Sequence, residues 1–220
     1  MKPELVVMLT HHDRTVENAI EVFQACRDTK ATCWGFKEVG IPKEEMKRLV
    51  QMMKDAGKRP FLEVVAYTEG ECLQGVQAGI ECGFETIMGT MYFPSVQKAV
   101  QDAGLRYMPF VGEIVGRPSV LQGSIQGMID EANDLLAKGV DGIDLLAYRY
   151  TGDAEKLIEA FVAGVNAPVC IAGSIDSFQR LDVMKRVSPW GFTIGGAFFE
   201  NKFQGSFAQQ VDTVCEYIAK

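Results

Sequence analysis

The sequence predicts an α/β protein built from eight consecutive strand–helix units. Three observations carry this prediction: short apolar runs recur eight times along the 220 residues, amphipathic segments with helical spacing lie between them, and glycine follows the end of most of those segments. Regular alternation of strands and helices is typical of a parallel sheet covered by helices. With 47% hydrophobic and 23% charged residues, the chain has the composition of a folded protein rather than a disordered or collagen-like one.

The eight apolar runs are short, rich in β-branched and aromatic residues, and continuous rather than alternating. This pattern favours strands that are buried on both faces, as in a parallel sheet. The runs begin at Leu5, Thr32, Pro60, Thr86, Arg106, Val140, Ala167 and Gly191.

The segments between the runs place apolar residues at the spacing of one helix face. Serine, threonine or aspartate precedes several of them and glycine follows several, which are the usual boundaries of helices. We therefore predict helices over Thr15–Asp28, Lys43–Ala56, Glu69–Cys82, Ser95–Ala103, Ser124–Lys138, Asp153–Ala163, Ser177–Val187 and Ser206–Ala219.

Eight such units can close into a (β/α)8 barrel, the TIM barrel, or form an open doubly wound sheet. The count of eight, in about the length that a barrel needs, favours the barrel. The open sheet usually carries the fingerprint G-x-G-x-x-G after its first strand, and that motif is absent there. No linker or change of composition divides the chain, so we predict one barrel domain over residues 1–220. The long insertion at residues 112–123 is a candidate lid.

Charge and hydropathy argue against several classes of function. The chain has 22 Lys and Arg against 29 Asp and Glu, a formal net charge of −7, and no basic run, so we expect neither nucleic acid nor a membrane surface as a partner. No apolar run approaches the roughly 18 residues of a membrane span, and no signal peptide is visible. Six single cysteines suit buried, reduced thiols. We expect a cytoplasmic protein, with a homodimer left open.

Charged residues interrupt the apolar strands at three places. Glu63 lies inside the run PFLEVVAY, Asp144 lies inside GIDLLAY, and Lys37 ends TCWGFK. A carboxylate in a strand buried on both faces must be paired, hydrogen-bonded or protonated. Because reacting groups of this fold come from the carboxyl ends of its strands, we expect Lys37, Glu63 and Asp144 to form a catalytic cluster. The alternative is a buried ion-pair network that only fills the barrel.

Other polar residues follow strand ends. His11 and His12 come after the first strand, and because neighbours in an extended segment point to opposite sides, at most one faces the site. We take His11 as a candidate acid, base or hydrogen-bond donor, and Thr90, after the fourth strand, as a candidate substrate contact. Two adjacent histidines are too few for a usual zinc shell, so we expect no metal and no other cofactor.

The last two strands end in glycine-rich segments. Gly173 and Ser174 follow the seventh strand, and Gly195 and Gly196 follow the eighth and open a short helical turn. Glycines let backbone N–H groups approach an anion, and these two loops are the usual phosphate site of a (β/α)8 barrel. Arg149, after the sixth strand, could clamp the same phosphate or a carboxylate. We therefore predict a phosphate-binding end, although turns that merely need glycine would look the same.

The two segments, PVCIAGSIDS and FTIGGAFF, resemble the phosphate-binding end of the ribulose-phosphate-binding barrel superfamily, over about the last fifth of the chain. That group includes phosphoribosyl isomerases, N-acetylmannosamine-6-phosphate 2-epimerase and phosphogluconate-type aldolases. The resemblance implies a TIM barrel that holds phosphate with Gly173, Ser174, Gly195 and Gly196. It assigns no catalytic residue, because the first six strands match no single member.

Two departures limit this resemblance. The decarboxylase motif Asp-x-Lys-x-x-Asp is absent from the third strand, and the sixth strand carries Asp144 where a phosphogluconate-type aldolase has its Schiff-base lysine. A weaker, whole-chain similarity is to small barrels labelled 4-hydroxythreonine-4-phosphate dehydrogenase. The established enzyme of that name is longer, metal-dependent and uses several dispersed histidines, whereas this chain has only two adjacent ones.

Two classes of function remain open from the sequence. The first is a cofactor-independent isomerase, epimerase or lyase that acts on a small phosphorylated sugar or related metabolite. Glu63 or Asp144 would remove a proton beside a carbonyl, while Lys37 polarises its oxygen; in a variant, Lys37 forms a Schiff base as in an aldolase. The second class is a barrel that binds a phosphorylated metabolite without converting it.

Overall fold

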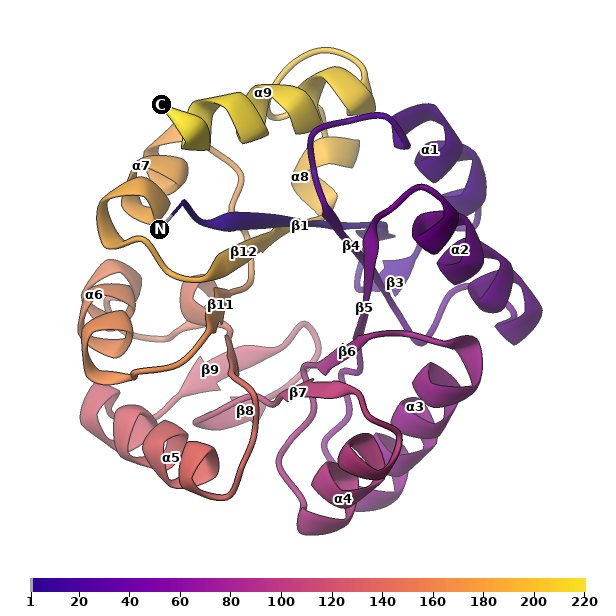
Figure 1. Cartoon of the computed structure of the whole chain (residues 1–220). Coiled ribbons are helices and arrows are strands. Elements are labelled where there is room, and N and C mark those ends of the chain that lie inside the picture. Colours follow the sequence, from indigo (N-terminus) through magenta and orange to yellow (C-terminus); the bar gives the residue numbers. More distant parts are fainter. Residues whose placement is uncertain (1) are drawn as a thin grey trace.

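The computed structural model describes residues 2–220 and contains eight parallel strands arranged as a nearly closed barrel (Figure 1). Each strand coincides with one of the eight predicted apolar runs to within one residue at its boundary or lies inside it, so the predicted (β/α)8 fold is confirmed. Around the barrel the strands follow the order β10, β11, β12, β1, β4, β5, β6 and β7. Their bounds are β1 Glu4–Met8, β4 Cys33–Lys37, β5 Arg59–Glu63, β6 Thr86–Met88, β7 Arg106–Met108, β10 Ile143–Leu145, β11 Val169–Ile171 and β12 Gly191–Ile194.

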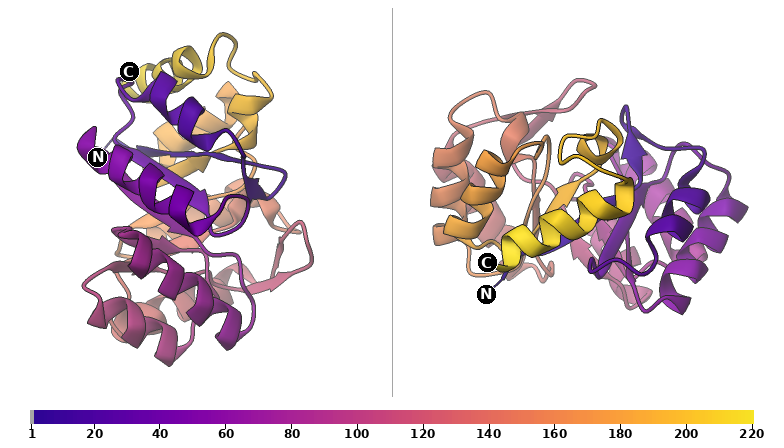
Figure 2. Two further views of the ribbon diagram at one scale, coloured as in Figure 1. Left: turned by 90° about the vertical axis from the view of Figure 1, so that its right-hand side faces the viewer. Right: turned by 90° about the horizontal axis from the view of Figure 1, so that it is seen from above.

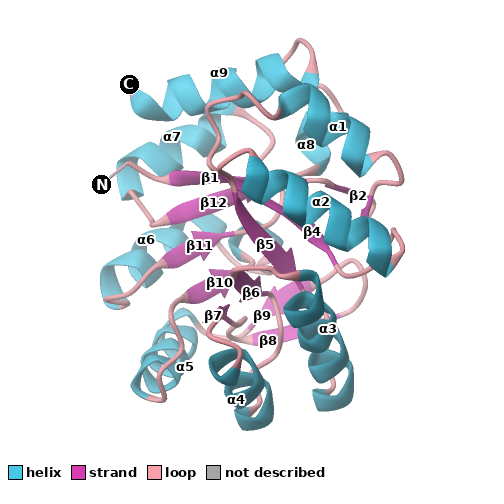
Figure 3. Cartoon of the chain, turned by 45° about the vertical axis from the view of Figure 1, so that its right-hand side comes forward, coloured by secondary structure: helices cyan, strands magenta, loops and turns pink. Residues whose placement is uncertain are grey.

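Helices surround the barrel and cover the outer face of its strands (Figures 1 and 3). The main apolar core lies between the two layers, where it includes Trp34, Phe36 and Phe161. The helices are α1 Ala19–Cys26, α2 Lys43–Asp55, α3 Glu69–Cys82, α4 Pro94–Asp102, α5 Ile125–Ala137, α6 Ala154–Gly164, α7 Phe178–Val187, α8 Gly196–Phe199 and α9 Phe207–Ala219, with a 3-10 turn, η1, at Ala147–Arg149. None of those helices is long and apolar enough to cross a membrane.

A smaller apolar cluster fills the interior of the barrel. It includes Val6, Cys33, Phe61 and Cys170, all nearly inaccessible to solvent. Because alternate residues of a strand share a face, Lys37 lies on the same face of β4 as Cys33, and Glu63 on the same face of β5 as Phe61. The strands thus direct these two charged side chains inward, above the apolar interior.

The first predicted helix was placed too early. Helix α1 begins at Ala19 rather than Thr15, because Arg14 and Thr15 form strand β3, which pairs with β2 (Thr10–His11) in a short hairpin. Thr15 is anchored to β4: its hydroxyl donates to the carbonyl oxygen of Lys37 at 2.7 Å and accepts from the backbone N–H of Lys37 at 3.0 Å. These bonds hold the β2–β3 turn next to the end of β4.

The insertion at residues 112–123 is not an irregular loop. It forms an antiparallel hairpin of β8 (Glu113–Val115) and β9 (Val120–Gln122). The hairpin and the β2–β3 turn project from the same end of the barrel, whereas the two chain ends lie together at the other end (Figure 2). The hairpin is therefore placed at the carboxyl ends of the strands, where the candidate site lies.

All six cysteines are buried and free, as predicted. Burial raises the pKa of the Cys33 thiol to about 11 and that of Cys215 to about 11. Thiols of this kind pack as small apolar residues.

Candidate active site

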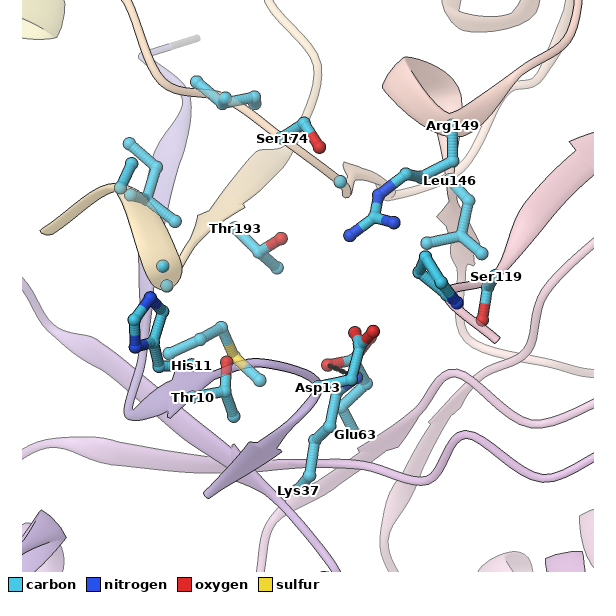
Figure 4. Close-up of a pocket in the computed structure, with 18 of the residues that line it drawn as sticks. Thr10, His11, Asp13, Lys37, Glu63, Ser119, Leu146, Arg149, Ser174 and Thr193 are labelled. Carbon is cyan, nitrogen blue, oxygen red and sulfur yellow. Dashed lines mark hydrogen bonds and ion pairs between the residues drawn. The ribbon is translucent and has the colours of Figure 1, made fainter. Parts of the chain in front are cut away.

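A cavity of about 360 Å³ opens at the carboxyl ends of the barrel strands (Figure 4). Residues from distant parts of the chain meet there, from the β2–β3 turn, β4, β5, the β8–β9 hairpin, η1, and the loops after β11 and β12. Eight of the ten predicted site residues line it: His11, Lys37, Glu63, Arg149, Gly173, Ser174, Gly195 and Gly196. Thr90 and Asp144 do not, for reasons given below.

Lys37 and Glu63 form an ion pair on neighbouring strands. The two residues are register partners between β4 and β5, and Lys37 Nζ lies 3.9 Å from Glu63 Oε2. Both side chains are mostly buried, with 9% and 13% of their surface exposed. A charged pair that still faces the cavity can act on a ligand, which a pair sealed inside the barrel could not do.

Asp13 contributes a second carboxylate to Lys37 that the sequence analysis missed. Its Oδ1 accepts a hydrogen bond from Lys37 Nζ at 3.2 Å, from the turn between β2 and β3. Burial disfavours the ammonium, but the charges of Glu63 and Asp13 outweigh it and raise the pKa of Lys37. Lys37 is therefore a cation at neutral pH.

The turn that carries Asp13 had a recognisable signal. His12 and Asp13 have φ values of 50° and 59°, in the left-handed region that aspartate tolerates better than most residues. The segment His-His-Asp-Arg between two apolar stretches was therefore a turn candidate, although only the contact between the turn and β4 brings Asp13 to Lys37.

Asp144 lies beneath the cavity rather than in its lining. It is fully buried, and neither carboxyl oxygen has a hydrogen-bond partner within residues 2–220. Burial, reinforced by the charge of Glu63, raises the pKa of Asp144 well above its usual value and so favours the protonated carboxyl. The structure places it close behind Glu63: a Cβ on Gly89 would lie 2.9 Å from Glu63 Cγ and 3.5 Å from Asp144 Oδ2.

Thr90 is not brought to the cavity. Its side chain is fully buried, and its hydroxyl shares a 2.5 Å hydrogen bond with the hydroxyl of Tyr107. The expectation that Thr90 contacts substrate rested on its place after a strand, and the side chain instead connects two strands behind the cavity wall.

Arg149 lies at the opposite end of the cavity from Lys37 (Figure 4). Its side chain packs on Gly173, where an added Cβ would lie 2.8 Å from Arg149 Cγ and the backbone φ is +85°. Glycine at position 173 is therefore required both for space and for backbone conformation. Within the described chain Arg149 forms no salt bridge, and its Nε is buried without a partner. An unpaired guanidinium facing a cavity suits an anionic ligand.

The glycine loops complete this end of the cavity. Gly195 packs against the end of β1 and the start of β2, where an added Cβ would lie 3.2 Å from Met8 Cβ and 2.7 Å from the hydroxyl of Thr10. Gly173 and Ser174 both have positive φ. Within residues 2–220, the backbone N–H groups of Gly173, Ser174 and Gly195 donate no hydrogen bond to the protein. Free N–H groups of this kind form anion-binding concavities.

His11 lies beside Thr10, on the side of the cavity opposite Arg149 (Figure 4). Its ring stacks on Phe199 at 5.6 Å, and its Nε2 lies 3.6 Å from a carboxylate oxygen of Glu200. It also approaches the start of α8, since an added Cβ on Gly196 would lie 3.4 Å from His11 Cδ2. This position suits contact with a bound anion better than proton transfer beside Glu63.

A second cavity of about 350 Å³ adjoins the first and shares Asp13, Lys37 and Val65 with it. Glu38 lines this second cavity, and its Oε2 is buried without a partner. Burial raises the pKa of Glu38 to about 7, against the opposing effect of a backbone hydrogen bond and nearby cations. The sequence did not predict Glu38 as a cavity residue. Strand alternation would have shown that its side chain points to the opposite side from that of Lys37.

The part of the chain that the structure describes contains no group of three or more His, Cys, Asp or Glu residues that could hold a metal ion. In the cavity, the Lys37 cation lies among carboxyl groups at one end, and the unpaired Arg149 cation lies among glycines at the other. The molecule is thus a (β/α)8 barrel with a cavity at the carboxyl ends of its strands whose two ends differ in charge.

Known structures share this fold across nearly the whole chain. The orotidine 5'-phosphate decarboxylase from Pyrococcus horikoshii OT3 superposes with a TM-score of 0.72 at 10% identity, over 98% of this chain and 99% of that one. KGPDC from Streptococcus mutans has a TM-score of 0.72 at 14% identity, over 100% and 98%. The N-acetylmannosamine-6-phosphate 2-epimerase from Clostridium perfringens has a TM-score of 0.66 at 13% identity, over 98% and 93%.

These structures include an enzyme of the superfamily that the glycine-rich motif resembles, so that resemblance is confirmed at the level of the fold. The similarity to barrels labelled 4-hydroxythreonine-4-phosphate dehydrogenase is not shown. No family model matches the chain, and no curated protein matches it.

Proposed function

We propose that this protein is an enzyme that moves a proton on a small phosphorylated sugar or related metabolite, as an isomerase, epimerase or lyase, without a metal or organic cofactor. The observation that carries the proposal is the polarity of the cavity. An unpaired arginine among free backbone N–H groups lies at one end, and a lysine–carboxylate pair lies at the other. The comparisons support the same class, since their names include an epimerase and a decarboxylase of phosphorylated compounds.

The phosphate would lie between Arg149 and the loops at Gly173 and Gly195. Arginine matches the geometry of a phosphate bidentately, and backbone N–H groups add hydrogen bonds that do not titrate. His11 would contact the same group from the side of α8. Binding energy from this remote phosphate can then orient the reacting carbon at the other end of the cavity.

Glu63 would serve as the general base. Its carboxylate faces the cavity beside a cation, so it can take a proton from the carbon next to a carbonyl. The Lys37 ammonium would donate a hydrogen bond to the carbonyl oxygen and stabilise the negative charge that develops there. Asp144 acts as a positioning residue in this scheme, because its fully buried carboxyl lies behind Glu63 and does not reach the cavity.

The Schiff-base alternative needs a neutral Lys37. The carboxylates around Lys37 raise its pKa, which opposes nucleophilic attack by the amine. Borohydride added with a sugar phosphate separates the two chemistries: we expect no covalent adduct on Lys37, and an adduct would establish the aldolase-type reaction instead.

Calorimetric titration with a panel of sugar phosphates tests the proposal at its binding step. We expect Arg149→Gln to weaken binding by at least about tenfold, the loss of one charge-assisted contact. The matched control, Arg48→Gln on the exposed face of α2, should leave affinity unchanged. Binding that is unaffected by Arg149→Gln would overturn the assignment of the phosphate end. Binding without turnover of any ligand would identify the non-catalytic barrel.

A further inference from the structure

The tip of the β8–β9 hairpin forms part of the cavity wall. Pro118 and Ser119, between the two strands of the hairpin, line the same cavity as Lys37 and Arg149 (Figure 4). Ser119 lies on the side of Leu146, between the two charged ends. The Ser119 hydroxyl is therefore a polar group at mid-cavity that the proposed reaction does not use.

The hydroxyl of Ser119 has a fixed hydrogen-bonding role. Tyr67 Oη donates to the carbonyl oxygen of Gly116 at 3.0 Å, and Tyr67 Oη and Ser119 Oγ lie 2.6 Å apart. A carbonyl can only accept, so the single proton of Tyr67 is used for Gly116. The bond between the two hydroxyls then requires Ser119 to donate to Tyr67. Ser119 Oγ consequently presents only acceptor lone pairs to the cavity.

Tyr67 is itself held in place by Arg117 over its ring. The Arg117 guanidinium lies over its ring at 5.1 Å, and Arg117 Nη2 donates to the carbonyl oxygen of Val65 at 3.1 Å. At the other end of the hairpin, Tyr150 Oη donates to the carbonyl oxygen of Gly123 at 2.8 Å. The hairpin is thus fastened to the barrel by several hydrogen bonds, which also include the backbone N–H of Thr151 to the carbonyl oxygen of Leu121 at 3.0 Å. Of the bonds named here, only that of Tyr67 reaches Ser119.

We propose that Ser119 is a specificity-determining residue that accepts a hydrogen bond from a hydroxyl group of the phosphorylated substrate, and that Tyr67 is the positioning residue that enforces this acceptor role. The inference rests on the proposed function for the location of the phosphate. It adds that the site selects substrates with a hydroxyl between the phosphate and the reacting carbon. A site with an acceptor held in this way discriminates against chains that lack the donor, because such chains cannot form this hydrogen bond.

The experiment compares three probes by calorimetry: inorganic phosphate, D-ribose 5-phosphate, and pentyl phosphate, which carries the phosphate on a five-carbon chain without hydroxyls. We expect Ser119→Ala to weaken the binding of D-ribose 5-phosphate by about threefold to tenfold, which is the effect of one lost hydrogen bond. The affinities for pentyl phosphate and inorganic phosphate should change by less than about twofold. Tyr67→Phe keeps the ring under Arg117. It should lower the ratio of the affinity for D-ribose 5-phosphate to that for pentyl phosphate by about twofold to fivefold.

The matched control is Tyr150→Phe, which removes an equivalent bond to the same hairpin without touching Ser119. It should leave the ratio of the D-ribose 5-phosphate and pentyl phosphate affinities unchanged. The inference is overturned if Ser119→Ala alters neither ratio nor affinity, if it weakens all three probes equally, or if Tyr150→Phe shifts the ratio as much as Tyr67→Phe does. A wild-type protein that binds none of the probes would refute the proposed phosphate site, and the inference with it.

Discussion

A single lysine and several carboxyl groups occupy one end of the cavity, and burial decides which of them carry charge. Lys37 is held as a cation by Glu63 and Asp13, whereas burial raises the pKa of Asp144 well above its usual value. Glu38 lies between these extremes, with a pKa of about 7. The pKa values of such close carboxyl groups differ because two adjacent negative charges are costly in a site with little water.

The raised pKa of Glu38 predicts a pH dependence of stability. Above the ordinary value of 4.5 the unfolded chain has lost this proton, while the folded chain keeps it until about pH 7. The contribution of the Glu38 carboxyl to the free energy of unfolding is therefore fully present below about pH 4.5. It is lost as the pH rises to about 7, and the loss is at most roughly 3 kcal/mol. Denaturant unfolding between pH 4 and 8 should show the wild type losing stability relative to Glu38→Gln.

Glu45→Gln, on the exposed face of α2, is the control for this series. Its stability should follow that of the wild type at every pH. A constant difference between the wild type and Glu38→Gln across the range would contradict the assigned protonation of Glu38.

Single elements explain how the proposed phosphate end of the cavity is built. Helix α8 has only four residues, and it is supported by α9 through aromatic contacts of Phe198 and Phe199 with Phe207 at 5.2 and 4.9 Å. Helix α9 begins with a capping box. Ser206 Oγ accepts from the backbone N–H of Gln209 at 3.3 Å, and Gln209 Oε1 accepts from the backbone N–H of Ser206 at 2.8 Å.

Loss of this cap should destabilise the fold. We expect Ser206→Ala to lower the free energy of unfolding by about 1 kcal/mol, because the backbone N–H of Gln209 at the start of α9 loses its acceptor. Ser177 occupies the equivalent position before α7 without a side-chain hydrogen bond, so Ser177→Ala should cost much less. Thermal and urea unfolding measure both changes, and equal costs for the two variants would refute the role of the capping box.

Sequence patterning predicted the long elements well and the short ones poorly. The apolar runs and helix boundaries located all eight barrel strands, and Glu69–Cys82 matches α3 at both ends. The two-residue strands β2 and β3 are too short to have a hydrophobic period, and the contact of Thr15 with β4 that creates them joins residues 22 positions apart. For the same reason Asp13 and Ser119 could not be placed in the site from local sequence.

For the whole molecule, barrel closure is what brings the two charged ends into one cavity. Strands β7 and β10 stand at the two ends of the strand order and are joined by no strand pairing within residues 2–220, and Pro109, just after β7, has no N–H to donate. Three hydrogen bonds cross the seam between β7 and β10: Asp141 N–H to Tyr107 O at 2.9 Å, Asp144 N–H to Pro109 O at 3.0 Å, and Tyr107 N–H to Asp141 Oδ2 at 2.9 Å. Asp144 is therefore fixed behind Glu63 by the same bonds that close the barrel.

Removal of the Asp141 carboxylate should weaken this seam. We expect Asp141→Ala to lower the free energy of unfolding by about 1 kcal/mol, the value of a partly exposed hydrogen bond to a charged group. Asp134→Ala, at an exposed position of α5, is the control and should have little effect. Chemical denaturation compares them, and an Asp141→Ala variant as stable as the control would show that the seam does not depend on this bond.

The prediction of the site from sequence depended on the same closure. Once eight units were counted, the fold rule that places reacting groups at strand ends brought Lys37, Glu63 and Arg149 into one cavity. The rule does not specify whether a residue points inward or is covered, which is why Thr90 was misplaced and Asp144 lies beneath the cavity floor. Those outcomes depend on packing against Tyr107 and Gly89, which no local pattern encodes.

The most direct test of the account is solvent exchange at carbon, followed by proton NMR of five- and six-carbon sugar phosphates in deuterated water. The wild-type protein should introduce deuterium at the carbon beside the carbonyl of at least one of them, and Glu63→Gln should slow that exchange by about 100-fold or more. Exchange that proceeds equally fast with Glu63→Gln, or that no sugar phosphate undergoes with the wild type, would contradict a proton-transferring site at Lys37 and Glu63.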